Sequence, residues 1–154
     1  MSSRCEGGRG QGGWIVSARM EFDTAALRQT IPFADVLGIE LASAAKDEVV
    51  ASMAWRAELC TSASLLHGGA LMAFADSVGA LCAFLNLPPG AGTSTIESKT
   101  NFFRGVREGA TVHSRTAPLH VGRTTVVVQT DLTDDDGKRV AQVTQTQAVL
   151  QPAG

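Results

Sequence analysis

The segment from residue 68 to residue 86 constrains the fold more than any other part of the chain. Helix-forming residues dominate it, and Pro88-Pro89 follow it closely. Between residues 69 and 85 only Asp76 and Ser77 are polar. A helix that is apolar on nearly all sides must be covered on nearly all sides, so the rest of the chain has to wrap around it. A carboxylate at the centre of a bilayer costs about 2.5–3.5 kcal/mol, so we do not expect this segment to span a membrane.

The segments on both sides of this helix show the alternation of apolar and polar residues that is typical of strands. We expect strands over 39–45 and 49–55, joined by a tight turn, and a polar loop over 56–64. Four longer strands follow the helix, over 93–103, 110–119, 124–132 and 140–150. A short helix over 23–31, capped by Asp23 or Thr24 and ended by Pro32, comes first, followed by an apolar turn to Gly38. The pattern predicts an α+β chain with the hotdog fold, in which an antiparallel sheet of about six strands curls around one long buried helix.

Length and composition limit the class of protein. The 154 residues suit one domain, and 44% hydrophobic residues exclude a fully disordered chain. A formal net charge of −2 predicts neither nucleic acid nor a membrane as partner. Residues 1–13 are Gly-rich and polar, which predicts a disordered tail rather than a signal peptide, with residues 14–154 forming a single domain. Cys5, Cys60 and Cys82 form no CxxC pair, so we expect three reduced thiols and a cytoplasmic location.

Several short motifs together resemble those of one enzyme family, the PaaI-like acyl-CoA thioesterases. The resemblance covers about residues 30–150 and rests on Leu66-His67-Gly68-Gly69 with Asp76 seven residues after Gly69, on Thr95–Arg104, on His120–Arg123, and on Gly137 with Val140-Ala141. It implies a hotdog enzyme that hydrolyses CoA thioesters and forms dimers, which pair into tetramers. CoA is then part of the substrate, and no other cofactor is expected.

The chemistry of thioester hydrolysis can be assigned to residues. The reaction needs a polarised carbonyl and either a nucleophile or a base that activates water. Gly68 and Gly69 place unpaired N–H groups at the start of the helix, and their lack of side chains lets a carbonyl approach; they would equally suit a tight turn. Asp76 is the candidate base or nucleophile, because a carboxylate in an apolar helix must be paired or face a wet cavity. Alternatively, Asp76 lies on one exposed stripe beside Ser77 or is bonded to a structural partner.

The spacing of these residues predicts self-association. Asp76 comes eight residues after Gly68, which is about 12 Å along a helix. One carbonyl group cannot touch both residues in the same subunit. If both act, two copies must contribute them, with their helices antiparallel across a two-fold axis. The sequence therefore predicts a homodimer with two shared sites, and the resemblance adds a dimer of dimers.

Four weaker candidates remain for the reaction. Thr95 matches the position where the family often has Ser or Thr near the catalytic carboxylate, where it would orient the attacking water. His67 is a possible acid or base, because histidine side chains in general change charge near neutral pH, although the family pattern more often uses this residue to position the turn. Thr61 occupies the position where the family usually has Asn or Gln to hold the carbonyl; either its hydroxyl substitutes, or the helix N-terminus acts alone, or the loop aligns differently. Cys60, paired with Cys82 or His67, is the remaining nucleophile.

Binding of CoA phosphates is the last site expectation. Arg104, Arg107 and Arg123 lie near predicted strand ends and could meet the phosphates, although each would equally serve as solvated surface charge. No metal site is expected, because the histidines show no ligand spacing with carboxylates or thiols: His67, His113 and His120.

Two other function classes stay open. A hotdog enoyl-CoA hydratase or dehydratase would keep the fold and use a His and a carboxylate on the β-carbon, although the spacing of His67 and Asp76 differs from that pattern. A non-catalytic acyl-CoA binding module would explain why Thr61 replaces the usual amide. The sequence favours the thioesterase.

Overall fold

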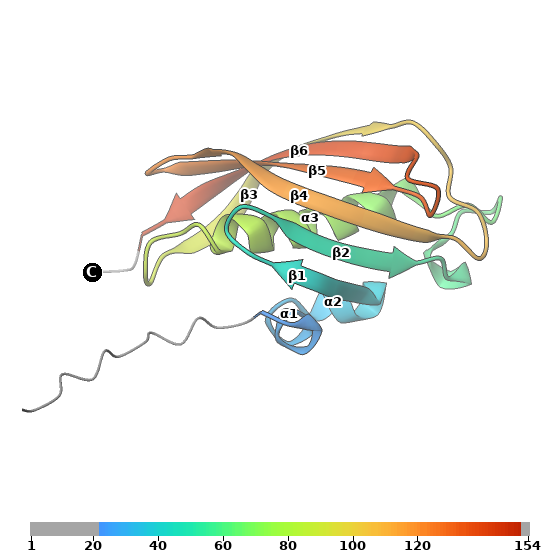
Figure 1. Ribbon diagram of the computed structural model, residues 1–154, viewed down its shortest axis with the longest axis horizontal. Helices are drawn as coiled ribbons and strands as arrows, with labels where there is room; N and C mark the ends of the chain where they lie inside the picture. The colour runs from blue at the N-terminus through green and yellow to red at the C-terminus, as the bar shows by residue number, and fades with distance from the viewer. Residues whose placement is uncertain (1–21, 152–154) are drawn as a thin grey trace, which may run out of the picture.

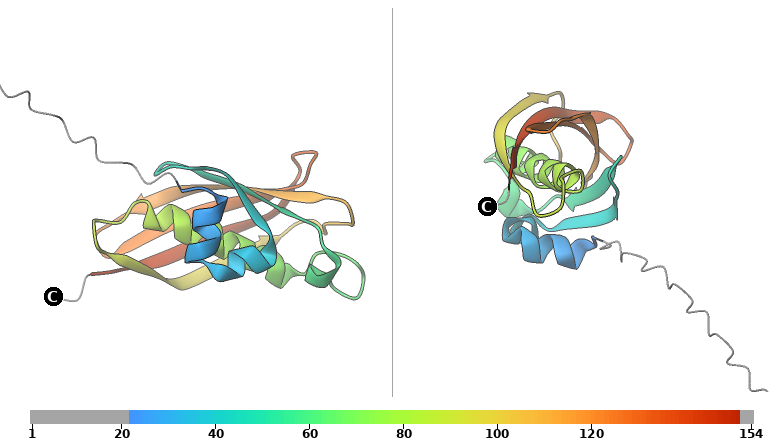
Figure 2. Two further views of the ribbon diagram at one scale, coloured as in Figure 1. Left: turned by 90° about the horizontal axis from the view of Figure 1, so that it is seen from below. Right: turned by 90° about the vertical axis from the view of Figure 1, so that its left-hand side faces the viewer.

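Six antiparallel strands form one sheet that curls around a central helix. The computed structural model describes residues 22–151. The strands are β1 (Ile39–Ala44), β2 (Val49–Ala54), β3 (Gly92–Phe102), β4 (Thr111–Val121), β5 (Thr125–Thr133) and β6 (Arg139–Leu150), and their order in the sheet is β1-β2-β4-β5-β6-β3. The helix α3 (Gly68–Phe84) lies in the hollow of this sheet (Figures 1 and 2). This arrangement confirms the predicted hotdog fold. The predicted tail, residues 1–13, lies outside the described residues.

Two short helices precede the sheet. Asp23 caps α1 (Thr24–Thr30) by accepting a hydrogen bond from the Ala26 N–H at 2.8 Å, as predicted. Pro32 then begins a second helix, α2 (Pro32–Leu37), where the sequence predicted only an apolar turn. That prediction was wrong because proline is well suited to the first position of a helix, where its missing N–H would have no partner. Gly38, with φ of 68°, ends α2 in the left-handed region.

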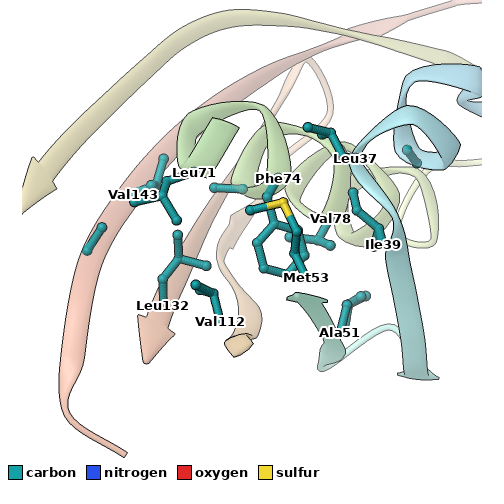
Figure 3. Packing of buried hydrophobic residues seen from close by; sticks show 14 of the residues in the cluster. Leu37, Ile39, Ala51, Met53, Leu71, Phe74, Val78, Val112, Leu132 and Val143 are labelled. Carbon is teal, nitrogen blue, oxygen red and sulfur yellow. The ribbon is translucent and has the colours of Figure 1, made fainter. Parts of the chain in front are cut away.

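The core of the molecule forms between α3 and the concave face of the sheet. Phe74 and Val78 of α3 are fully buried. Figure 3 shows them among side chains from β1, β2, β4, β5 and β6, including Ile39, Met53, Val112, Leu132 and Val143. Helix α3 ends at Phe84, two residues earlier than the 68–86 pattern predicted. None of the described helices is long and apolar enough to cross a membrane.

One stripe of α3 is left uncovered by the rest of the chain. Met72 and Phe84 are 39% and 43% exposed, and Gly69 is exposed as well. Asp76 and Ala80 lie between them and are half-buried. We call Gly69, Met72, Asp76, Ala80 and Phe84 the open stripe. Ser77 does not share it, contrary to the sequence-based alternative: it is buried, and its hydroxyl donates to the Ala73 carbonyl at 2.9 Å.

The strand beside this stripe, β3, is an edge strand with a bulge. Thr95 pairs with Gln147 and Glu97 pairs with Thr146, so Ile96 is an extra residue. In a regular strand Thr95 and Phe102, seven positions apart, would face opposite sides. The bulge brings both toward α3, where the Thr95 hydroxyl donates to Asp76 and the Phe102 ring lies against Gly68. One strand therefore contacts both the middle and the start of the helix.

Candidate active site

The carboxylate of Asp76 is held by a network of side chains from β3 and β6. Its Oδ1 accepts hydrogen bonds from the Thr95 hydroxyl at 3.0 Å and from Gln145 Nε2 at 2.5 Å. Gln145 Nε2 also donates to Thr95 Oγ1 at 3.1 Å, and Gln147 Nε2 donates to the same oxygen at 2.8 Å. The Thr93 hydroxyl donates to Gln147 Oε1 at 2.9 Å. Within residues 22–151 no hydrogen bond is recorded to Asp76 Oδ2, so one carboxylate oxygen is anchored and the other is available.

This network extends beyond the residues that sequence reasoning identified. Asp76 and Thr95 were candidates, and the structure brings them into direct contact. Gln145 and Gln147 were missed, because the alternating Thr and Gln residues of β6 do not indicate which of the two faces the helix. In the structure the buried positions alternate from Val143 to Gln147, so both glutamines lie where apolar side chains would be expected.

The start of α3 presents a second candidate centre. His67 is the N-cap residue, and its Nδ1 accepts a hydrogen bond from the Gly69 N–H at 2.8 Å. Since Nδ1 accepts, the neutral imidazole carries its proton on Nε2. Gly69 is therefore already engaged, and among the described residues no acceptor is recorded for the Gly68 N–H. Of the two predicted carbonyl-polarising amides, Gly68 is the one left free in this structure.

Gly68 and Gly69 are needed because a side chain would not fit there, and not because the backbone makes a turn that requires glycine. Neither has a φ in the left-handed region. A Cβ at Gly68 would lie 3.2 Å from the Phe102 ring, and one at Gly69 would lie 2.9 Å from His67 Nδ1. The first glycine makes room for the aromatic ring and the second for the capping imidazole. The backbone at the helix start consequently stays accessible.

A pocket of about 290 Å³ lies beside this helix start. It is lined by Phe33, Leu37, Glu58, Leu59, Cys60, His67, Gly69 and Ala70. Thr61 is not among these lining residues. Its Oγ1 accepts the Ala63 N–H at 3.3 Å and its N–H donates to the Leu65 carbonyl at 2.8 Å, so Thr61 stabilises its own loop.

Cys60 and Cys82 are poor nucleophiles. Partial burial, together with Glu58 and Glu108, raises the pKa of the Cys60 thiol. Burial, with a smaller effect of Asp47, raises the pKa of Cys82 to about 11. With these raised pKa values both thiols stay largely protonated at neutral pH. Since the thiolate is the reactive form of cysteine, both residues react slowly. Cys60 does line the same pocket as His67.

A second, wholly apolar pocket of about 190 Å³ lies one helical turn beyond Asp76. Ala80, Leu81 and Phe84 of α3 form one wall, Thr93 of β3 forms another, and Phe22, Leu27, Thr30 and Ile31 close it. The Thr93 hydroxyl is turned toward Gln147, so the pocket presents no free polar group there. Such a pocket suits an uncharged hydrocarbon group.

The three candidate phosphate-binding arginines lie at two ends of the sheet. Arg104 and Arg107 belong to the segment after β3, which contacts the start of α3 through a hydrogen bond from the Leu66 N–H to the Val106 carbonyl at 3.0 Å. Arg123 lies in the turn between β4 and β5, at the same end of the sheet as the start of β3 but with β6 between them (Figure 1). All three are exposed. Among the described residues, no group of three or more His, Cys, Asp or Glu is placed to hold a metal ion.

Known proteins share both the sequence pattern and the fold. The model of the thioesterase superfamily matches residues 63–141. The chain is 31% identical over 142 residues to PA1618 of Pseudomonas aeruginosa, covering 92% of this chain and 96% of that protein. The crystal structure of a variant of PA1618, described as a thioesterase, superposes with a TM-score of 0.78, 30% identity, and coverage of 86% and 96%.

Two further proteins add to this comparison. Thioesterase HI1161 of Haemophilus influenzae superposes with a TM-score of 0.79 at 27% identity, covering 86% of this chain and 94% of that one. The 1,4-dihydroxy-2-naphthoyl-CoA hydrolase of Escherichia coli is 33% identical over 86 residues, which cover 56% of this chain and 62% of that enzyme.

Proposed function

Because the chain belongs to the thioesterase superfamily, we propose that this thioester hydrolase acts on acyl-CoA and that Asp76 is its base or nucleophile. The observation that carries the proposal is the asymmetric binding of the Asp76 carboxylate. Oδ1 is fixed by Thr95 and Gln145, whereas no partner of Oδ2 is recorded among residues 22–151. A similar enzyme, the hydrolase of Escherichia coli, is named for a CoA thioester, which supports the substrate class.

The site is complete only when two copies of the chain associate. Gly68 and Asp76 are about 12 Å apart along α3, too far to reach one carbonyl group and its attacking atom. A two-fold axis beside the open stripe would place Gly68 of one copy near Asp76 of the other. Exposed apolar side chains support such an interface: Met72 and Phe84 on α3, and Ile96 and Phe102 on β3, whose outer edge pairs with no other strand among residues 22–151. A further pairing of dimers into tetramers rests on the family resemblance alone.

The proposed reaction uses one group from each copy. The substrate carbonyl oxygen accepts a hydrogen bond from the Gly68 N–H, with the positive end of the helix dipole behind it. In one route Asp76 Oδ2 removes a proton from water as the water oxygen adds to the carbonyl carbon. The tetrahedral intermediate then expels the CoA thiolate, which takes up that proton, and the acid is released. In the other route Oδ2 attacks the carbonyl carbon itself and the CoA thiolate leaves, which forms an anhydride between Asp76 and the acyl group. Water then hydrolyses the anhydride, which releases the acid, restores the Asp76 carboxylate and supplies the proton that the thiolate takes up.

The surroundings of Asp76 suit the two halves of the substrate. The apolar pocket at Ala80 and Phe84 would hold the acyl group. Arg104 and Arg107 lie near the start of α3, and Arg123 lies at the opposite end of β3. A two-fold axis that makes the helices antiparallel would bring these opposite ends to the same region of the dimer, where they could bind the CoA phosphates. Arginine suits this role because its guanidinium matches phosphate geometry.

The first experiment measures release of CoA thiol from short, long and aromatic acyl-CoAs. We expect Asp76→Asn to lower kcat by about 10²- to 10⁴-fold, the range associated with loss of a general base. Asp131→Asn is the matched control, because Asp131 also accepts a hydrogen bond from a β6 glutamine, Gln142, but on the opposite face of the sheet. Full activity in Asp76→Asn would remove Asp76 from the chemistry. Absence of CoA release by the wild type from every substrate would overturn the acyl-CoA proposal.

A mixing experiment tests whether the site is shared. Asp76→Asn and Gly68→Val would each be inactive alone, but a mixed dimer would keep one intact site. Random association at equal amounts then restores about a quarter of wild-type activity, because half of the dimers are mixed and each has one working site. If the mixture stays inactive although mass spectrometry shows mixed dimers, each site lies within a single copy.

A further inference from the structure

Two glutamines of β6 occupy positions where the core would ordinarily be apolar. Gln145 and Gln147 are 1% and 0% exposed, and both face α3 from the concave side of the sheet. Burying an amide is costly unless its hydrogen bonds are made. Apolar side chains at these two positions, like that of Val143 on the same face of β6, would stabilise the fold equally well. The placement of these amides therefore calls for an explanation beyond packing.

The hydrogen bonds fix which way each amide points. An ionised carboxylate only accepts hydrogen bonds, so Gln145 must turn its Nε2 toward Asp76. Its two N–H groups are then both used, one on Asp76 Oδ1 and one on Thr95 Oγ1. Gln147 is oriented from its other side, because its Oε1 accepts from the Thr93 hydroxyl and its Nε2 donates to Thr95.

The direction of the Thr95 proton follows from this count. A hydroxyl accepts at most two hydrogen bonds and donates one. Gln145 and Gln147 occupy both acceptor positions of Thr95 Oγ1, so its proton has to point at Asp76 Oδ1, 3.0 Å away. Thr95 then has no lone pair left for water, which differs from the water-orienting role that its position in the sequence suggested. Its hydroxyl is fully used in holding the carboxylate.

We propose that Gln145 and Gln147 are positioning residues for the hydrolysis, Gln145 acting on Asp76 directly and Gln147 acting through Thr95. They hold Oδ1 from the side of β6 and so direct Oδ2 toward the open stripe. This inference rests on the proposed function of Asp76. Helix α3 leaves room for the Gln145 side chain at Gly79. This glycine faces Gln145 Oε1, and a Cβ at residue 79 would lie 2.1 Å from that oxygen.

The test compares the same substitution on two faces of β6. Gln145→Met keeps the length of the side chain and removes both N–H groups, and Gln142→Met does so on the outer face. We expect Gln145→Met to lower kcat roughly 10- to 100-fold with KM changed less than about threefold, because a misplaced base weakens the chemical step more than binding. Gln147→Met, one step further away, should lower kcat by about 3- to 10-fold, and Gln142→Met should leave it unchanged. Unchanged kcat in Gln145→Met would overturn the inference.

A double-mutant comparison separates positioning from general structural damage. If Gln145 acts only through Asp76, adding Gln145→Met to Asp76→Asn changes the residual rate by less than about twofold. An equal loss in both backgrounds would show a merely structural role. Should Gln145→Met fail to fold, Thr95→Val and Thr95→Ser make the comparison: Ser keeps the hydroxyl and should retain kcat within about threefold, whereas Val should not. Equal rates of those two variants would also overturn the inference.

A readout without substrate keeps this inference distinct from the proposed function. The side-chain amide protons of Gln145, identified in NMR spectra by their absence in Gln145→Met, should shift in Asp76→Asn because their acceptor changes. The amide of Gln142 should not shift. A wild type that releases no CoA would overturn the proposed function, and the positioning role with it. If the wild type is active but the amide protons of Gln145 do not shift in Asp76→Asn, the positioning role alone is overturned.

Discussion

Gly79→Ala is the substitution for which the structure predicts the clearest energetic effect. The new Cβ would lie 2.1 Å from Gln145 Oε1, which is closer than real Cβ atoms approach a neighbour, and 3.1 Å from Gln145 Cδ. Gln145 would have to leave its position and give up its bonds to Asp76 and Thr95. Overpacking a core costs about 1–3 kcal/mol, and unmade buried hydrogen bonds cost about 1–3 kcal/mol more. Alanine is better than glycine in a helix by about 1 kcal/mol, so we expect a net destabilisation of about 1–5 kcal/mol.

The same reasoning predicts that most of this cost disappears when Gln145 is shortened. In a Gln145→Ala background Val128 Cγ2 still lies 3.3 Å from the new Cβ, and the higher helix propensity of alanine, worth up to about 1 kcal/mol, should offset most of the remaining cost of Gly79→Ala. The measurement is urea unfolding followed by circular dichroism, at one protein concentration because the stability of the proposed dimer would depend on it. Gly92→Ala is the control, since its Cβ would meet Leu150 at an ordinary 3.8 Å. Equal destabilisation of the wild type and of Gln145→Ala by Gly79→Ala would refute the argument.

Three further outcomes are expected. His67→Ala should destabilise the protein by about 0.5–2 kcal/mol in urea unfolding and His67→Asn by less, because Asn can also cap a helix; equal losses would contradict the capping role. A hydrogen bond from the Thr111 N–H lowers the pKa of Asp135 below the ordinary value of an Asp carboxyl, so the contribution of Asp135 to stability is present at neutral pH and is lost as the pH falls through that lowered pKa. Asp135→Asn should therefore flatten the acid side of the stability profile, and an unaltered profile would contradict this. Cys82, whose pKa is raised to about 11, should resist iodoacetamide at pH 8 in the native protein and react after unfolding, as mass spectrometry can show.

The fold could be predicted from the sequence because its pattern is strong and local. The long helix and all six strands were expected within about two residues of their observed ends. Helix α2 was missed because Pro32 was interpreted as the end of a helix, whereas proline also begins helices well. The bulge at Ile96 was not predicted, since it depends on pairing with β6 and no glycine next to Ile96 marks it in the sequence.

The candidate site was predictable in part. The resemblance identified Asp76, Thr95 and the start of the helix, since these carry sequence motifs. Gln145 and Gln147 carry none, and an alternating Thr-Gln strand is ordinarily interpreted as having a polar outer face. Only the structure shows that the glutamines, rather than the threonines, face the helix. The engagement of the Gly69 N–H by His67 also depends on side-chain orientation that no motif records.

The bulge in β3 makes Ile96 the position where this strand can lose a residue at least cost. Thr95 pairs with Gln147 and Glu97 pairs with Thr146 whether or not a residue stands between them. Deletion of Ile96 would keep both residue pairs, and Thr95 and Phe102 would still both face α3. After a deletion at any other position between Thr95 and Phe102, these two side chains both face α3 only if the bulge is lost as well, and the residues between Ile96 and the deletion then turn to the opposite face. Natural variants of this chain that differ in the length of β3 are therefore expected to differ at the bulge.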